Sequence, residues 1–228
     1  MDVDDDKRLA AEAAVGEVRD GMLVGLGTGS TAAHMIRALG RLVADGLRIE
    51  AVATSWASTD LARGLGIRVH DFADVGRVDL TIDGADEIDR AMLVIKGAGG
   101  AMLREKCVAA ASDRMVVIAD GAKRVGRIGA ARVPVEVLPF ARAYVVRVLA
   151  ERSDPRLRTA GAAPYRTDQD NLVVDCAFRD LSDPHEVAAW LQAIPGVLGH
   201  GLFLSEADAA YLATGGVVTK LERPVPSR

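Results

Sequence analysis

The feature that most constrains the fold is a regular alternation of short apolar runs with longer amphipathic stretches. The runs, rich in Val, Ile and Leu, occupy residues 22–26, 49–54, 67–72, 78–83, 92–95 and 114–119. Runs of this length are typical of strands buried in a parallel sheet. The stretches between them, such as STAAHMIRALGRLVADG at 30–46, carry apolar residues at helical spacing. This alternation predicts a doubly wound, mainly parallel α/β domain, whose ligands bind at the carboxyl ends of the strands.

The pattern changes near residue 132. A strand (VPVEVLP, 133–139) and a helix (140–153) are followed by two strands (157–160 and 171–178), a helix (183–194) and a strand (196–204). Asp183 and Pro184 suit the cap and the first turn of the second helix. The order β-α-β-β-α-β is that of the ferredoxin-like unit, an α+β arrangement.

The sequence therefore predicts two domains. Residues 132–205 form the smaller, ferredoxin-like domain. Residues 1–131 and 206–228 form the Rossmann-like domain, in which a strand at 209–214 rejoins the first sheet and residues 215–223 form a tail.

Composition limits the class of protein. The chain has 228 residues, of which 50% are hydrophobic, and a net charge of -4, so it lacks the basic footprint of a nucleic-acid-binding protein. No apolar run approaches membrane-spanning length, and the acidic start MDVDDDKRLA is not a signal peptide. Two cysteines form no disulfide framework. We expect a cytoplasmic protein with no nucleic-acid or membrane partner.

The loop GTGST at 27–31 follows the first apolar run and precedes a helix. Its glycines allow backbone N–H groups to converge, Ser30 and Thr31 add hydroxyl donors, and a helix N-terminus favours negative charge. Neither the dinucleotide fingerprint nor the Walker A pattern fits, because Ser30 stands where the first needs glycine and no lysine follows Gly29. The loop is either an anion site or an ordinary strand-to-helix turn with a hydroxyl cap.

Two further loops carry charged residues at predicted strand ends. DGADEID (83–89) is a solvated acidic loop, a divalent-metal site, or a ligand-binding loop led by Asp83, and it lacks the EF-hand pattern. In KGAGGAMLREK (96–106), Lys96 follows a strand and Glu105 lies early in a helix, where a carboxylate commonly complements the dipole. If Asp83, Lys96 and Glu105 share a cleft, they form an acid/base set with a charge stabiliser.

Lysine is scarce here, since only five of the 28 basic residues are lysines. Lys96 precedes a glycine cluster, and Lys123, in ADGAKR at 119–124, follows a strand, so we expect it to point toward the same cleft. The histidines fall outside these loops, so we interpret them as structural or exposed: His34, His70, His185 and His200. Without a Cys/His cluster, no zinc site is expected.

Taken in order along nearly the whole chain, the motifs resemble those of the type A ribose-5-phosphate isomerase family. They are GLGTGSTAAHMI, TS at 54–55, DGADEID, KGAGGAMLREK, ADGAKRVG, PVEVLP, TDQDNLVVDC and IPGVLGHGLF. The resemblance implies interconversion of D-ribose 5-phosphate and D-ribulose 5-phosphate in the non-oxidative pentose phosphate pathway, without metal or nucleotide cofactor. It also implies a Rossmann-like domain with a ferredoxin-like lid, and a homodimer or homotetramer.

The resemblance assigns roles by position. Glu105 matches the base that moves a proton between C2 and C1. Lys96 would stabilise the enediolate oxyanion, and Asp83 would assist ring opening and proton transfer between oxygens. The substrate-binding residues would be Lys7 near the phosphate and Thr28, Gly29, Ser30, Thr31, Asp83, Gly84, Ala85, Asp86, Lys96, Gly97, Ala98, Gly99 and Lys123.

Two positions depart from the family pattern. Ala98 interrupts a row of glycines, which is tolerable if its φ is negative, and Asp170 replaces a glycine in a turn, where aspartate tolerates positive φ better than most residues. A sugar-phosphate sensor and another enzyme of similar fold, such as an acyl-CoA transferase or a sugar lactonase, are alternatives. The sensor would need a helix-turn-helix segment and a basic face, and neither alternative explains Lys96 and Glu105 within one KGxGGAxxREK run.

Overall fold

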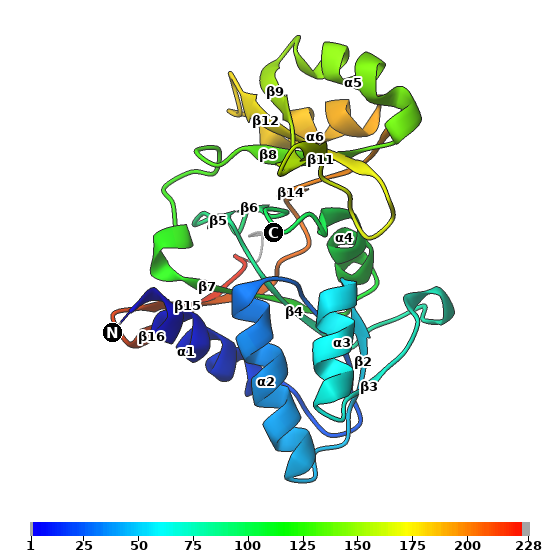
Figure 1. Ribbon diagram of the computed structural model, residues 1–228. Helices are drawn as coiled ribbons and strands as arrows, with labels where there is room; N and C mark the ends of the chain where they lie inside the picture. Colours follow the sequence, from blue (N-terminus) through cyan, green and yellow to red (C-terminus); the bar gives the residue numbers. More distant parts are fainter. Residues whose placement is uncertain (1, 225–228) are drawn as a thin grey trace.

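The computed structural model describes residues 2–224, and its centre is a seven-stranded sheet (Figure 1). The strand order is β16-β15-β7-β4-β1-β2-β3, and every neighbouring pair is parallel except β15 with β16. The strands are β1 (Leu23–Leu26), β2 (Glu50–Ala53), β3 (Arg68–Val69), β4 (Leu80–Gly84), β7 (Met115–Asp120), β15 (Ala209–Thr214) and β16 (Val217–Glu222). The predicted doubly wound, mainly parallel α/β class is confirmed.

Different layers cover the two faces of this sheet. On one face lie α1 (Val3–Val15), α2 (Ser30–Ala44) and α3 (Trp56–Gly64). On the other lie α4 (Met102–Ala110) and a three-stranded sheet of β5 (Glu87–Ile88), β6 (Val94–Ile95) and β14 (Leu202–Phe203). Strand β7 shows the two-residue period behind this arrangement, because Val116 and Ile118 join the first core and Val117 and Ala119 the second.

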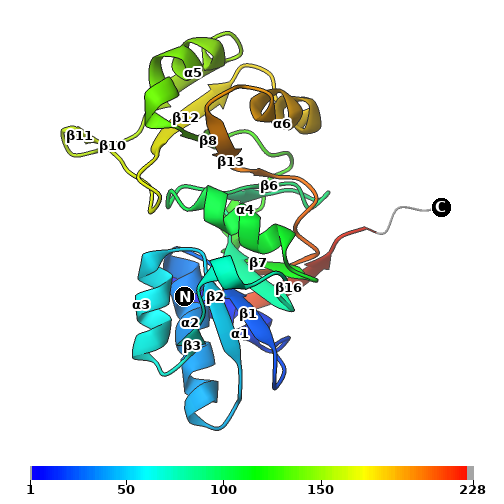
Figure 2. The same cartoon turned by 90° about the vertical axis from the view of Figure 1, so that its right-hand side faces the viewer.

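A second domain, here called the small domain, is made of β8 (Val133–Val137), α5 (Arg142–Leu149), β9 (Ser153–Leu157), β12 (Leu172–Phe178), α6 (Pro184–Gln192) and β13 (Val197–His200). Its antiparallel sheet has the order β13-β8-β12-β9, which is the predicted ferredoxin-like arrangement. A short hairpin of β10 (Thr159–Ala160) and β11 (Ala163–Pro164) extends from it. In Figure 2, α4 and β6 lie between the main sheet and the small domain.

Several predicted strands were wrong in extent or in sheet. The run at 67–72 forms only the two-residue β3, followed by a 3-10 turn, η1 (Phe72–Asp74). The run at 92–95 was expected among the parallel strands, but β6 belongs to the separate antiparallel sheet. Periodicity cannot separate these cases, because a short apolar run fits any buried strand. Residues 215–223 do not form a tail, because Val217–Glu222 within them are an antiparallel edge strand, β16.

The predicted strand at 196–204 divides into β13 and β14, which belong to different sheets. The division falls at Gly201, whose N–H donates to Pro134 O and whose carbonyl accepts from Lys96 N. A Cβ at this position would collide with the Lys96 carbonyl, so the crossing needs glycine. The same residue therefore joins the small domain to Lys96, the residue that follows β6.

The chain order creates a crevice at the carboxyl ends of β1 and β4. The chain runs outward from β1 through β2 to β3 and then returns to β4 on the other side of β1. Ligands of open α/β sheets bind at such a switch point. Loop 27–31 follows β1, and Asp83 lies at the end of β4. Among residues 2–224, no helix is long and apolar enough to cross a membrane.

Candidate active site

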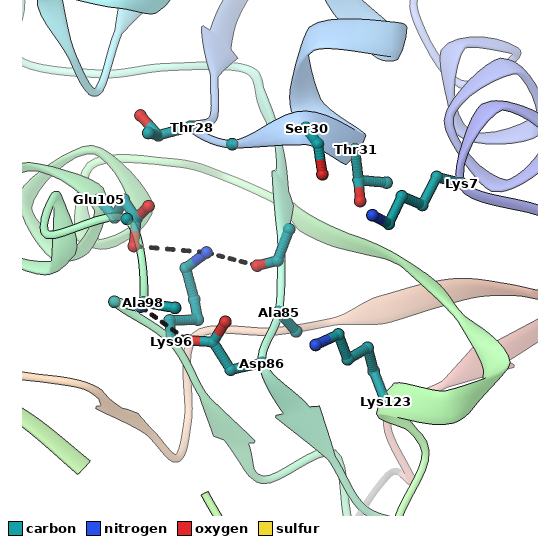
Figure 3. Close-up of a pocket in the computed structure, with 14 residues that line it drawn as sticks. Lys7, Thr28, Ser30, Thr31, Ala85, Asp86, Lys96, Ala98, Glu105 and Lys123 are labelled. Carbon is teal, nitrogen blue, oxygen red and sulfur yellow. Dashed lines mark hydrogen bonds and ion pairs between the residues drawn. The ribbon is translucent and has the colours of Figure 1, made fainter. Parts of the chain in front are cut away.

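A cavity of about 200 Å³ opens at this switch point (Figure 3). The lining residues come from α1, the loop after β1, the end of β4, the turn after β6, helix α4 and the 3-10 turn η2 (Gly121–Lys123). They are Lys7, Thr28, Gly29, Ser30, Thr31, Gly84, Ala85, Asp86, Lys96, Gly97, Ala98, Gly99, Glu105 and Lys123. The structure thus brings together every sequence-predicted site residue except Asp83, which lies beneath the cavity wall.

Three buried charged side chains meet at the inner end of the cavity, where Lys96 and Glu105 line it and Asp83 lies beneath them. Lys96 Nζ lies 3.1 Å from Asp83 Oδ2 and 3.4 Å from Glu105 Oε2, and it also donates to the Gly84 carbonyl. The side chains of Asp83, Lys96 and Glu105 are 0%, 2% and 4% exposed. Within residues 2–224, the ion pair with Lys96 is the contact of Glu105 Oε2, which has no other hydrogen-bond partner there.

Local backbone contacts fix the position of Asp83. Its Oδ1 accepts hydrogen bonds from Thr28 N at 3.0 Å and Gly84 N at 2.7 Å. Gly27 packs directly against it, since a Cβ there would overlap the Asp83 carboxylate. Glycine in the apolar run before Thr28 therefore allows β1 and β4 to approach closely at this point.

Burial and mutual charge shift the protonation of this cluster. Burial and, to a lesser extent, the negative charge of Asp83 outweigh the opposing effect of Lys96 and together raise the pKa of Glu105 to about 8. Burial acts to lower the pKa of Lys96, but the attraction of Asp83 and Glu105 outweighs it and raises that pKa above its ordinary value. The cluster therefore combines a permanent cation with a carboxyl group that titrates near neutral pH.

The outer end of the cavity has the features of an anion site. Helix α2 begins after Gly29, whose φ of 106° few other residues adopt, and its first turn has neither an acidic residue nor a side-chain cap. Its first N–H groups therefore face the cavity without a capping side chain. In Figure 3 the ammonium group of Lys7 lies beside Thr31, and that of Lys123 lies near Ala85. Neither lysine forms an ion pair within the described part of the chain.

The small domain supports the wall of the cavity, a contribution that sequence reasoning missed. Arg158 Nη1 donates to the carbonyls of Gly97 and Ala98, each at 3.0 Å, and the Tyr165 hydroxyl donates to Gly99 O at 3.1 Å. The wall is also held from below, where Ala98 N donates to Asp86 Oδ2 at 2.8 Å. No spacing rule links the hairpin with a loop some 60 residues earlier, so the sequence held no signal for these contacts.

The two departures from the family pattern adopt conformations that their side chains allow. Ala98 is not among the non-glycine residues of 2–224 with positive φ, so its methyl group causes no backbone strain. Asp170 has a φ of 60° in the turn before β12, a conformation that aspartate reaches more readily than most residues. Both expectations about backbone conformation are confirmed.

The acidic loop 83–89 is not one cluster, because its carboxylates face different partners. Glu87 is buried and accepts from Gly129 N and Ala131 N, at 2.7 and 2.6 Å. Asp89 accepts from Ala91 N and Leu93 N and closes a turn. Within residues 2–224, no group of three or more His, Cys, Asp or Glu residues is placed to bind a metal ion. None of the histidines in that range lines the cavity.

Comparison with known proteins identifies the family. The model of the family "Ribose 5-phosphate isomerase A (phosphoriboisomerase A)" matches residues 50–216. Ribose-5-phosphate isomerase A of Sphingopyxis alaskensis is 50% identical over 214 residues, which are 93% of this chain and 94% of that protein. The enzyme of Caulobacter vibrioides is 47% identical over 229 residues, covering 97% of this chain and 100% of its own length.

Solved structures agree in fold. Ribose 5-phosphate isomerase A from Neisseria gonorrhoeae superposes with a TM-score of 0.92 at 37% identity, covering 98% of this chain and 99% of that one. A D-ribose-5-phosphate isomerase in complex with phospho-erythronic acid gives a TM-score of 0.94 at 34% identity, covering 98% of this chain and 100% of that one. With the cavity described above and relatives this similar over nearly its whole length, this chain belongs to the ribose 5-phosphate isomerase A family.

Proposed function

We propose that the protein interconverts D-ribose 5-phosphate and D-ribulose 5-phosphate through an enediolate. The single observation that carries the proposal is the buried pair of Glu105 and Lys96 at one end of a cavity whose other end suits an anion. The reaction needs a base beside a C–H bond, a cation beside the carbonyl oxygen and a holder for the phosphate. The relative solved with phospho-erythronic acid supports a phosphorylated sugar derivative as the ligand class.

In this mechanism the phosphate lies at the start of α2 between Lys7 and Lys123. Glu105 removes the proton from C2, the electron pair moves into the C1–C2 bond, and the aldehyde oxygen becomes an oxyanion that Lys96 stabilises. Glu105 then returns its proton to C1, while the O2 hydroxyl proton is transferred to O1, and ribulose 5-phosphate results. Asp86, which lines the cavity, accepts hydrogen bonds from sugar hydroxyls. No metal or cofactor takes part in the proposed steps.

Asp83 has a different position from the other proposed residues. Because it is 0% exposed and outside the cavity lining, its first task is to hold Lys96 protonated and in place. Proton transfer between sugar oxygens, the role implied by the family resemblance, requires that its carboxylate become exposed when substrate binds. We therefore propose that Asp83 acts through Lys96 in the free enzyme.

We extend the proposal to organisation and location. We propose the domain boundaries 1–131 plus 206–228 and 132–205, supported by the anchoring of Gly129 and Ala131 on Glu87 just before the first boundary.

A free, exposed Cys107 favours a reducing compartment such as the cytoplasm. Phe140, 95% exposed and close to the exposed Leu138 and Tyr144, favours self-association into a homodimer or homotetramer.

The test is a coupled assay of the purified protein with ribose 5-phosphate, with and without EDTA, beside Glu105→Gln. The proposal expects EDTA-resistant formation of ribulose 5-phosphate that the substitution nearly abolishes. A wild-type protein that binds ribose 5-phosphate without converting it would contradict the enzymatic function and favour a sensor.

A further inference from the structure

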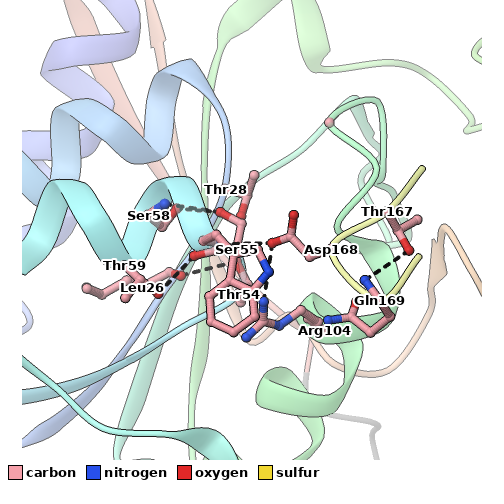
Figure 4. Close-up of polar contacts among 12 residues, drawn as sticks. Leu26, Thr28, Thr54, Ser55, Ser58, Thr59, Arg104, Thr167, Asp168 and Gln169 are labelled. Carbon is pink, nitrogen blue, oxygen red and sulfur yellow. Dashed lines mark hydrogen bonds and ion pairs between the residues drawn. The ribbon is translucent and has the colours of Figure 1, made fainter. Parts of the chain in front are cut away.

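One carboxylate of the small domain reaches both helices beside the cavity. Asp168 lies in the turn between β11 and β12, and its Oδ2 accepts from Trp56 N at 2.7 Å and from Arg104 Nη1 at 3.2 Å (Figure 4). Trp56 is the first residue of α3, and Arg104 directly precedes Glu105 in α4. The Arg104 guanidinium also stacks over the Trp56 ring at 4.5 Å. Asp168 thus joins three separate elements through one oxygen.

The turn that carries Asp168 is anchored on a buried carboxylate. Glu136, in strand β8, is fully buried, and its Oε1 accepts from Thr167 Oγ1 and from Asn171 Nδ2, each at 2.9 Å. Thr167 N donates to Asn171 O at 3.0 Å, which closes the turn. Both ends of the turn are therefore fixed to the small-domain sheet through Glu136, which holds Asp168 in place on that domain.

The contacts continue from α3 to the cavity wall. Ser55 caps α3 by accepting from Ser58 N, and Ser58 Oγ donates to Gly27 O at 2.7 Å. The neighbouring Thr54 Oγ1 lies 2.7 Å from Thr28 Oγ1, and Thr28 lines the cavity. A shift of the α3 N-terminus would therefore displace loop 27–31. A shift of Arg104 would displace Glu105, the next residue of α4.

We propose that Asp168 is a positioning residue for the reaction: it joins the small domain to α3 and α4 and thereby fixes Glu105 and Thr28 at the cavity. The proposal rests on the isomerase function proposed above. Asp168 and Arg104 are only partly exposed, at 31% and 20%, so their ion pair is less screened than the pairs on the open surface. Misplacement of a reacting group by about 1 Å can cost a large factor in rate.

The test compares Asp168→Ala with Asp168→Asn, Arg104→Ala and the double variant. The matched control is Asp170→Asn, which alters an exposed carboxylate of the same turn at a φ that asparagine tolerates. We expect Asp168→Ala to lower kcat roughly tenfold with little change in KM. Asp168→Asn should recover part of the loss because it keeps an acceptor for Trp56 N. The double variant should lose no more than the worse single variant.

A second measurement does not depend on turnover. The chain has two tryptophans, so Trp190→Phe leaves Trp56 as the single reporter beside Asp168 and Arg104. In that background, Asp168→Ala should change the emission of Trp56, and Asp170→Asn should not. If the wild type isomerises ribose 5-phosphate while Asp168→Ala keeps full kcat, the positioning role is refuted. An inactive wild type refutes the proposed function instead, and an unchanged Trp56 emission then also refutes the contact.

Discussion

Both ends of the cavity carry charged side chains, but in opposite environments. At the inner end, Asp83, Lys96 and Glu105 are almost entirely buried and in contact with one another. At the outer end, Lys7 and Lys123 are partly exposed and face the start of α2. In water a charge keeps its ordinary pKa and attracts a counter-ion, whereas out of water its protonation depends on its neighbours. The comparison predicts that the inner end governs kcat and the outer end governs binding.

The largest effect is expected from Glu105→Gln, which removes the base and keeps the shape. We expect kcat to fall by roughly 10²–10⁴-fold, with KM changed far less. Steady-state kinetics in the coupled assay measures both values. Glu206→Gln is the matched control, because Glu206 is a second partly buried glutamate paired with a lysine, Lys106, outside the cavity. Near-normal turnover by Glu105→Gln would contradict the prediction that the inner end of the cavity governs kcat.

Lys96→Met should affect both activity and stability. Loss of the oxyanion partner should reduce kcat by roughly 10²–10³-fold. The free energy of unfolding should drop by about 3–5 kcal/mol, because Asp83 is left buried without its cation. Denaturant titration measures the second effect.

The double variant Asp83→Asn, Lys96→Met separates these two consequences. It should regain much of the lost stability and none of the activity. Recovery of turnover in the double variant would mean that Lys96 serves only to neutralise Asp83.

At the outer end, Lys7→Ala and Lys123→Ala should raise KM roughly ten- to a hundredfold each and leave kcat within a few-fold, since each removes one charged hydrogen bond to phosphate. Competitive inhibition by inorganic phosphate should weaken in parallel. Lys220→Ala, which removes a surface lysine paired with Glu17 and Glu222, is the control. A loss confined to kcat would contradict the comparison.

The smallest effect on chemistry is expected from Phe140→Asp. Phe140 lies on the small domain, is exposed and does not line the cavity, so kcat and KM should stay within about twofold, as for an ordinary surface substitution. Its expected effect is on self-association, measured by light scattering after size-exclusion chromatography. A monomeric wild type would contradict the proposed role of this surface.

Sequence alone was sufficient for the elements whose pattern is local. The strand–helix alternation predicted the main sheet, and the order of strands and helices after residue 132 predicted the ferredoxin-like arrangement. The sequence did not predict that β6 belongs to a separate sheet, or that the strand at 196–204 divides at Gly201. In both places the pairing partner, and not the local pattern, decides which sheet a segment joins. Long-range register carries no local signal.

The same distinction between local pattern and long-range contact applies to the candidate active site. Loops at the ends of parallel strands meet at one edge of the sheet, which led us to consider a cleft shared by Asp83, Lys96 and Glu105. The three side chains do lie together, although Lys96 follows β6, which belongs to the separate antiparallel sheet and not to the parallel one. The burial of Asp83 beneath Lys96 could not be predicted, since it depends on Gly27 packing against the carboxylate. The supports from Arg158, Tyr165 and Asp168 depend on how two domains dock, which residue spacing does not encode.

The central claim is that burial makes Glu105 the base, and the pH dependence of kcat/KM tests it most directly. A carboxyl whose pKa is raised is protonated, and inactive as a base, until the pH exceeds that raised value. The account predicts that log kcat/KM rises with pH through an apparent pKa near 8, above the second pKa of about 6 of the sugar phosphate itself. A profile without a transition near pH 8, in which kcat/KM falls only with the sugar phosphate near 6 and an ordinary glutamate near 4.3, would contradict it.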